Sequence, residues 1–156
     1  GVASPNAGSV QITAGTLRFS QGNAADAAVT RAFNLQGASS AIVTFSVADT
    51  GVGGFLSGDN EQLLFEFAAD GVNFVSLRTF DGDNPGNVSV TLPTNVPFGT
   101  DAAIRFRVNN TLDPPGNIFN PTAETFSIDN VTINAVFQQP ADPPSIDIET
   151  SYTEDG

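Results

Sequence analysis

The sequence contains no cysteine, histidine, lysine, methionine or tryptophan, and each absence narrows the chemistry that the chain can perform. Without cysteine there is neither a disulfide nor a thiolate metal site, so cysteine usage says nothing about the redox compartment. Without histidine or lysine the chain lacks the base of the usual nucleophile–base pairs and the amine of Schiff-base chemistry. A pair of carboxylates, as in glycoside hydrolysis, is the catalytic arrangement that remains.

Three glutamates are candidates for such a pair, namely Glu61, Glu66 and Glu124. Glu66 alternates with Phe65 and Phe67, and alternation along a strand places it on the face opposite the two rings. We therefore expect Glu66 on a solvated strand face rather than in a catalytic cleft, and we predict that the protein is not an enzyme.

Basic residues are also scarce. Five arginines stand against 17 acidic residues, which gives a net charge of −12. Such a surface repels phosphate backbones and anionic lipids, so we expect no nucleic-acid partner. We expect no membrane insertion either, because no segment reaches the ~20 apolar residues that span a bilayer. The acidic excess has two interpretations, which are solubility and the binding of divalent cations by carboxylate-rich loops.

Apolar residues alternate with polar ones along nearly the whole chain, which is the period of a β-strand. Eight or nine such segments are separated by Gly, Pro, Asn and Asp. They centre on residues 10–12, 17–19, 29–35, 41–47, 63–67, 75–80, 88–92, 104–108 and 126–137. Ala14-Gly15 and Asp70-Gly71 are turn signals between successive segments. The pattern predicts an all-β protein, an antiparallel two-sheet β-sandwich of the jelly-roll type.

Two segments also predict which side chains share a face. In 75–80 we expect Val75 and Leu77 on one face, and Phe74 and Phe80 on the other. In 104–108 the two arginines alternate with apolar residues, so they should form an outward cationic row.

The last segment changes parity in its middle. Phe126 and Ile128 place apolar side chains at even positions, whereas Val131 and Ile133 place them at odd positions. One face of a strand cannot stay apolar across this change without an extra residue, so we predict a β-bulge at Asp129-Asn130.

The sequence predicts three parts. Residues 1–137 should form the β-sandwich module. Residues 138–145 are rich in proline and should be an extended, semi-rigid linker. Residues 146–156 alternate again and then stop, and we interpret them as the start of a following module or a disordered tail.

Several loops offer oxygen ligands. Asp81 and Asp83 lie in D-G-D-N-P-G-N, which departs from the EF-hand template at its fifth and twelfth positions, so an ordinary Asx-rich hairpin loop is the simpler interpretation. Asp59 lies in the Gly-rich stretch 51–60, which is either a long edge loop or a ligand-binding loop. Asp113 and Asn117 lie in 109–123, the longest stretch without a pattern.

Several segments together resemble a known group of modules. V-T-R-A-F-N-L-Q-G-A-S-S-A-I-V-T-F-S, L-L-F-E-F-A-A-D-G-V-N-F-V-S-L, I-R-F-R-V-N-N and F-S-I-D-N-V-T-I resemble segments of carbohydrate-binding-module-like or MAM-like jelly rolls. Such modules occur in large secreted bacterial calcium-binding adhesins of the RTX and VCBS type. The tail S-Y-T-E-D-G resembles the opening of the cadherin-like or VCBS-type modules that follow in such proteins.

The resemblance implies a calcium ion as the cofactor. In many modules of this kind the Asp of the final I-D-N-V strand helps to hold a structural calcium beside the N-terminal strands, and Asp129 matches that position. Asp26 is our candidate for the second metal ligand. The alternative is that Asp129 accepts backbone N–H groups at the bulge without an ion.

These observations lead to one function and one alternative. The leading interpretation is a non-catalytic, calcium-stabilised adhesin module, secreted or on the bacterial cell surface. It would bind a glycan or other cell-surface ligand, or space the neighbouring modules of the same chain. The alternative is a carbohydrate-binding module of a secreted polysaccharide-active enzyme. Sugar platforms are usually built from Trp and Tyr, and this chain has neither before Tyr152.

Overall fold

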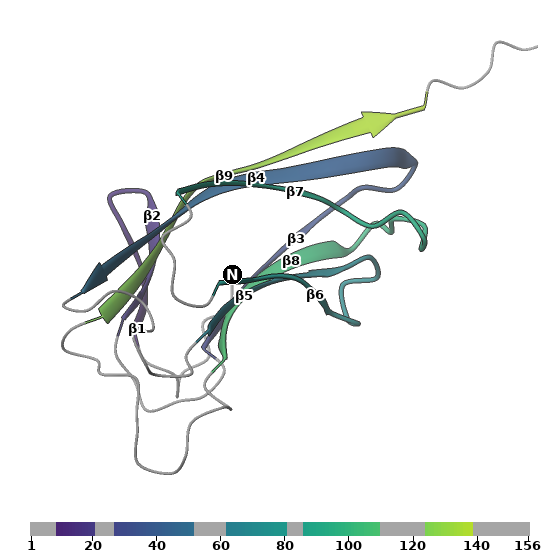
Figure 1. The fold of residues 1–156 in the computed structure, drawn as a ribbon. Helices are drawn as coiled ribbons and strands as arrows, with labels where there is room; N and C mark the ends of the chain where they lie inside the picture. Colours follow the sequence, from purple (N-terminus) through teal and green to yellow (C-terminus); the bar gives the residue numbers. More distant parts are fainter. Residues whose placement is uncertain (1–8, 21–26, 52–61, 81–85, 110–123, 139–156) are drawn as a thin grey trace, which may run out of the picture.

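A computed structural model of the chain describes residues 9–20, 27–51, 62–80, 86–109 and 124–138 (Figure 1). These residues form nine strands, which confirms the predicted all-β fold. The strands are β1 (Ser9–Thr13), β2 (Thr16–Ser20), β3 (Ala28–Phe33), β4 (Ala38–Gly51), β5 (Gln62–Ala68), β6 (Val75–Phe80), β7 (Gly86–Thr91), β8 (Ala102–Asn109) and β9 (Glu124–Phe137). Within these ranges, no helix has the length and hydropathy needed to cross a membrane.

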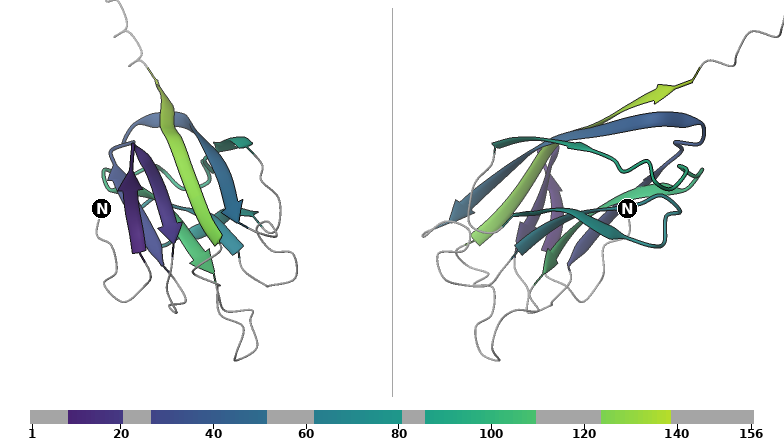
Figure 2. Two further views of the ribbon diagram at one scale, coloured as in Figure 1. Left: turned by 90° about the vertical axis from the view of Figure 1, so that its left-hand side faces the viewer. Right: turned by 45° about the vertical axis from the view of Figure 1, so that its right-hand side comes forward.

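The strands form two antiparallel sheets that face each other as a sandwich (Figures 1 and 2). The five-stranded sheet has the order β1-β2-β9-β4-β7, and the four-stranded sheet has the order β3-β8-β5-β6. Long strands β4 and β9 pair along nearly their full length and form the centre of the five-stranded sheet. Most pairings join strands that are distant in sequence, so this arrangement depends on burial of the apolar face that each strand pattern provides.

Phenylalanine rings from both sheets make the centre of the core. Phe45 of β4 contacts Phe65 of β5, Phe106 of β8 and Phe80 of β6, with ring centroids 4.9, 5.0 and 6.1 Å apart. Phe45, Phe65 and Phe106 are nearly completely buried. In a chain without Trp or Met, phenylalanine supplies the largest fully buried side chains of the core.

The two predicted turns are present. Ala14 and Gly15, both with positive φ, connect β1 to β2 as a two-residue hairpin loop. At the turn after β5, Asp70 accepts the backbone N–H groups of Val72 and Asn73 at 2.9 and 2.8 Å. Gly71 has a φ of 75°, and a Cβ there would clash with the backbone carbonyl oxygen of Asp101, so only glycine fits.

The predicted bulge in β9 is also confirmed. Ser46 of β4 lies opposite Asp129, but Thr44, two residues away, lies opposite Thr132, three residues away. The additional residue on β9 lets the apolar side chains on both sides of the bulge face the core. Asn130 occupies the bulge with a φ of 54°, a conformation that Asn tolerates better than most residues.

A second bulge, on β6, makes one prediction wrong. The pairing with β5 shifts between Phe65 and Glu66, so β6 contains one residue more than its partner. Leu77 and Phe80 therefore both pack against the core, although simple alternation placed them on opposite faces. Phe74 lies outside this bulge and contacts a side chain of the outer face instead.

Candidate functional site

The outer face of the four-stranded sheet carries a row of polar side chains across all four strands. Thr30 of β3 lies opposite Arg105 of β8, Arg105 lies opposite Glu66 of β5, and Glu66 lies opposite Ser76 of β6. We call these four residues the polar row. The expected outward position of the arginines of β8 is confirmed by the burial of the apolar residues between them.

Glu66 is not solvated, contrary to the sequence-based expectation. Its exposed fraction is 4%. Its Oε2 lies 2.6 Å from Nε of Arg105, and its Oε1 lies 2.9 Å from Nη2 of Arg107. The prediction was wrong because alternation reports only which face a residue occupies. Whether neighbouring strands cover that residue depends on the register between β5 and β8.

The two arginines keep this carboxyl charged. Burial raises the pKa of Glu66, but hydrogen bonds and charge from Arg107 and Arg105 outweigh burial and hold the pKa below its ordinary value. A carboxylate held in this state cannot act as a general acid near neutral pH. The cluster is therefore a fixed ion-pair network rather than a pair of acid and base groups.

Arg105 is held on two sides. Its guanidinium carbon lies 3.9 Å from the centroid of the Phe74 ring, a close cation–π contact, and its Nε is bonded to Glu66. The side chain nevertheless remains 27% exposed. Within the described part of the chain, its two Nη groups form no hydrogen bond. Arg105 thus offers N–H donors in a fixed orientation, a role that sequence analysis did not assign to it.

Asp129 lies on the outer face of the other sheet, at the bulge and beside the β1–β2 hairpin. Its Oδ1 accepts the backbone N–H of Asn130 at 2.7 Å, and its Oδ2 accepts the Thr16 hydroxyl at 3.3 Å. The Ser46 hydroxyl donates to the backbone oxygen of Asp129 at 3.2 Å. This bonding matches the alternative in which the carboxylate is satisfied by the bulge itself.

The described residues alone do not form a calcium cage. They contain no group of three or more His, Cys, Asp or Glu that could hold a metal ion. Asp129 with the two neighbouring hydroxyls provides fewer oxygens than the six to eight that calcium takes. The other predicted ligands, which are Asp26, Asp59, Asp81, Asp83, Asp113 and Asn117, lie outside the described residues. Calcium binding at Asp129 therefore stays a prediction.

Comparison with known proteins reveals likeness of fold. No protein-family model and no curated protein matches the sequence. Among solved structures, the chain is similar to a mutant of a carbohydrate binding module family 29, with a TM-score of 0.51 and 14% identity over 83% of this chain and 76% of that one. A second family 29 structure has a TM-score of 0.47 and 12% identity, over 83% and 73% of the two chains. A CBM29-2 mutant complexed with cellulohexaose also has a TM-score of 0.47 and 12% identity, over 83% and 75%.

At this level of identity the likeness concerns the fold alone. It agrees with the jelly-roll sandwich expected from the strand pattern, and it assigns no binding residue to this chain. The class that fold and geometry define is a β-sandwich module with a polar row on the outer face of its four-stranded sheet.

Proposed function

We propose that this domain is a carbohydrate-binding module and that the polar row contacts the glycan. The observation that carries the proposal is Arg105, whose guanidinium is fixed by Glu66 and Phe74 while its Nη groups make no hydrogen bond within the described residues. A donor fixed before binding loses little side-chain entropy when it bonds a sugar hydroxyl. In the same row, the Thr30 hydroxyl lies beside Arg105, and the Ser76 hydroxyl lies on the far side of Glu66.

The comparisons favour this function over the adhesin interpretation. A carbohydrate binding module shares the fold of this chain, whereas nothing in the comparisons points to adhesins of the RTX or VCBS type. Because fold does not imply function, the likeness only supports the proposal, and the polar row supplies the chemistry.

The glycan should be neutral and recognised mainly by hydrogen bonds. The chain has no Trp, and its single Tyr is Tyr152, so broad aromatic platforms are scarce. The net charge of −12 disfavours acidic glycans, and the Glu66 carboxylate offsets one of the two positive charges of Arg105 and Arg107. Sugar hydroxyls both donate and accept, which suits a row of guanidinium, carboxylate and hydroxyl groups.

The test is a neutral glycan array followed by calorimetric titration of each hit, in calcium and in chelator. Arg105→Lys keeps the positive charge beside Glu66 but loses the planar fork, so the Kd should rise roughly tenfold or more, the cost of losing a charged hydrogen bond. The control is Arg18→Lys, at an exposed position on the outer face of the other sheet. Equal affinity of both variants for the same glycan, or no retained glycan under either condition, contradicts the proposal.

We further propose that the module serves a secreted polysaccharide-active enzyme. This setting predicts a catalytic domain elsewhere in the full-length protein. Tandem repeats of this module with a C-terminal secretion signal would instead favour the adhesin setting, in which the same surface would hold a cell-surface glycan. Sequencing of the complete gene distinguishes the two settings without any assumption about the binding surface.

A further inference from the structure

Among the described strands, the second half of β9 has a partner on one side only. Strand β2 pairs with residues 125–128 of β9 and then ends at the hairpin turn. Residues 132–137 pair with β4 on their other side. Figure 1 shows this half of β9 extending well past the β1–β2 hairpin. Within the described part of the chain, this stretch is therefore a sheet edge with backbone N–H and C=O groups available for pairing.

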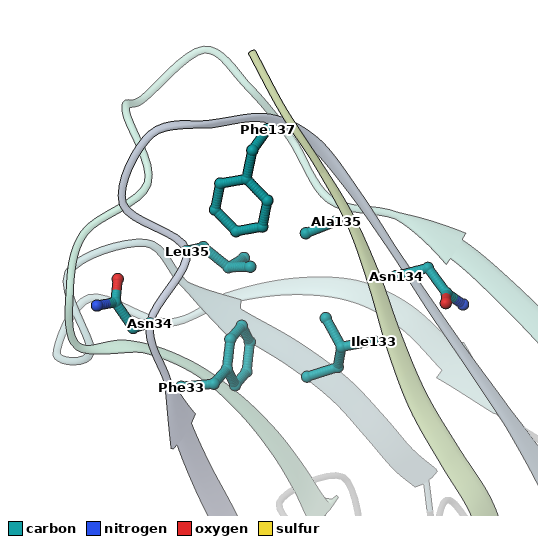
Figure 3. Close-up of a pocket in the computed structure, with 7 residues that line it drawn as sticks. All are labelled: Phe33, Asn34, Leu35, Ile133, Asn134, Ala135 and Phe137. Atoms are coloured by element: carbon teal, nitrogen blue, oxygen red, sulfur yellow. The ribbon is translucent and has the colours of Figure 1, made fainter. Parts of the chain in front are cut away.

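A cavity opens beside this edge, between the two sheets, and five of the seven side chains that line it are apolar. It has a volume of about 490 Å³. Figure 3 shows Phe33, Leu35, Ile133 and Phe137 pointing toward one another in this cavity, whereas the side chain of Asn134 points away from it. A sugar would find few polar partners among these side chains. The chemistry of the cavity instead suits apolar side chains of a polypeptide strand.

The cavity continues along the same side of the sandwich. A second space of about 520 Å³ shares Phe33 and Ile133 with the first. Its other lining residues are apolar except Arg31 of β3, which is exposed at the rim. Strand β3, on the opposite side of this groove, pairs only with β8 among the described strands. Among the described strands, both sheets thus end on this side, and the groove between them follows the edge of β9.

The composition of this edge indicates what covers it. In a protein of net charge −12, residues 130–138 contain no charged residue and no proline. Three of the eight large apolar side chains that are exposed in the described residues lie here: Val131 at 43%, Val136 at 60% and Phe137 at 57%. Natural edge strands usually carry charges, prolines or bulges that prevent pairing. This stretch of β9 itself carries only the bulge at Asn130, and a further register shift lies on its partner β4, opposite Val136 and Phe137. An uncharged patch is also where two strongly acidic copies can approach with least repulsion.

We infer that two copies of this protein associate through antiparallel pairing of β9 with β9 of a second copy, about a twofold axis at Asn134. The sequence is complementary to itself in this register. On the core side, Ile133 would lie opposite the partner's Ala135, and Val131 opposite the partner's Phe137. Large residues thus meet smaller ones, and the groove of each copy is closed. Such a contact is isologous and stops at two copies.

The register gives a test at one position, because a residue on the axis meets its own copy. Asn134→Cys introduces a single cysteine into a chain that has none, and facing residues in an antiparallel pair lie within disulfide reach. Mild oxidation of the intact chain should convert this variant rapidly to a covalent dimer. The control is Ile42→Cys, which is exposed on the same outer face and pairs with Asn134 within one copy.

Sedimentation of the native chain supplies the second measurement. We expect a dimer, and Asn134→Lys should shift it to monomer by placing two like charges opposite each other, whereas Ile42→Lys should not. The inference is overturned if the native chain is monomeric at all concentrations, if cysteines at the two positions cross-link equally, or if the Asn134→Lys variant remains dimeric. None of these outcomes depends on whether the domain binds a glycan.

Discussion

Asn130 and Asp129 show how a single residue pair changes the direction of a strand. Asn130 adopts a positive φ, and the carboxylate of Asp129 accepts its backbone N–H at 2.7 Å. A carboxylate bonded in this way needs no ion to remain satisfied. Its second oxygen, however, has only a weak contact of 3.3 Å with Thr16 and could also bind a cation supplied with further ligands.

Calcium binding at this residue is tested by melting. If a calcium ion holds Asp129, a chelator should lower the melting temperature of the native protein, because metal bound only to the folded state stabilises it by about 2.7 kcal/mol at a hundred times the Kd. Asp129→Asn should melt lower in calcium and respond far less to the chelator. If the native protein melts at the same temperature in excess calcium and in chelator, Asp129 does not bind calcium and only stabilises the bulge.

At the scale of the element, the turn between β5 and β6 depends on Asp70. Hydrogen bonds from the backbone N–H groups of Asn73 and Val72, and from the Asn73 side chain, lower the pKa of Asp70 from its ordinary value of 3.8 to about 2. A lowered pKa in the folded state means that the ionised form is stabilised by folding. This contribution is present above pH 3.8 and is lost as the pH falls toward 2.

The turn therefore predicts a pH effect on unfolding. Asp70→Asn should make the protein less stable near neutral pH and should flatten the loss of stability between about pH 4 and pH 2, because the variant has no proton to bind there. Asn73→Ala keeps the backbone donors and should give an intermediate slope. Urea unfolding at a series of pH values measures both slopes. If the native protein and Asp70→Asn lost stability in parallel, the turn would not be the origin of this acid dependence.

At the scale of the whole molecule, the strands of both sheets close one core around Phe45. The last strand of this core, β9, ends at Phe137. The predicted linker, 138–145, and the predicted following segment, 146–156, fall almost entirely outside the described residues. The division of the chain into a module and a tail therefore remains a prediction.

Deletion of residues 140–156 tests this division. We expect the melting temperature to stay nearly unchanged, because a proline-rich stretch followed by a short strand pattern buries little apolar area. Deletion of residues 134–156 is the contrasting variant, because it also removes part of β9 and should lower the melting temperature strongly. A large decrease for the first deletion would mean that the tail is a strand of this domain.

More of the fold than of the candidate site could be predicted from the sequence. The two turns and the β9 bulge depend on the φ preferences of Gly and Asn and on the period of the strand. The local amino-acid sequence is therefore enough to predict them. The β6 bulge has no such local signal, because Phe74 and Phe80 alternate regularly with their neighbours. The polar row is likewise invisible to a single-strand pattern, since each of its residues comes from a different strand.

The sequence by itself determined the chemistry and the class of this protein. It excludes thiol, imidazole and amine chemistry, sets a strongly acidic charge, and specifies short alternating strands that must bury phenylalanine between two sheets. The tertiary structure decided the environment of each polar group. Register between distant strands placed Arg105 and Arg107 on Glu66 and converted an apparently solvated glutamate into a buried ion pair. Because β2 begins only at Thr16, the second half of β9 pairs with β4 alone among the described strands. Both depend on contacts between residues far apart in the chain, which local periodicity does not encode.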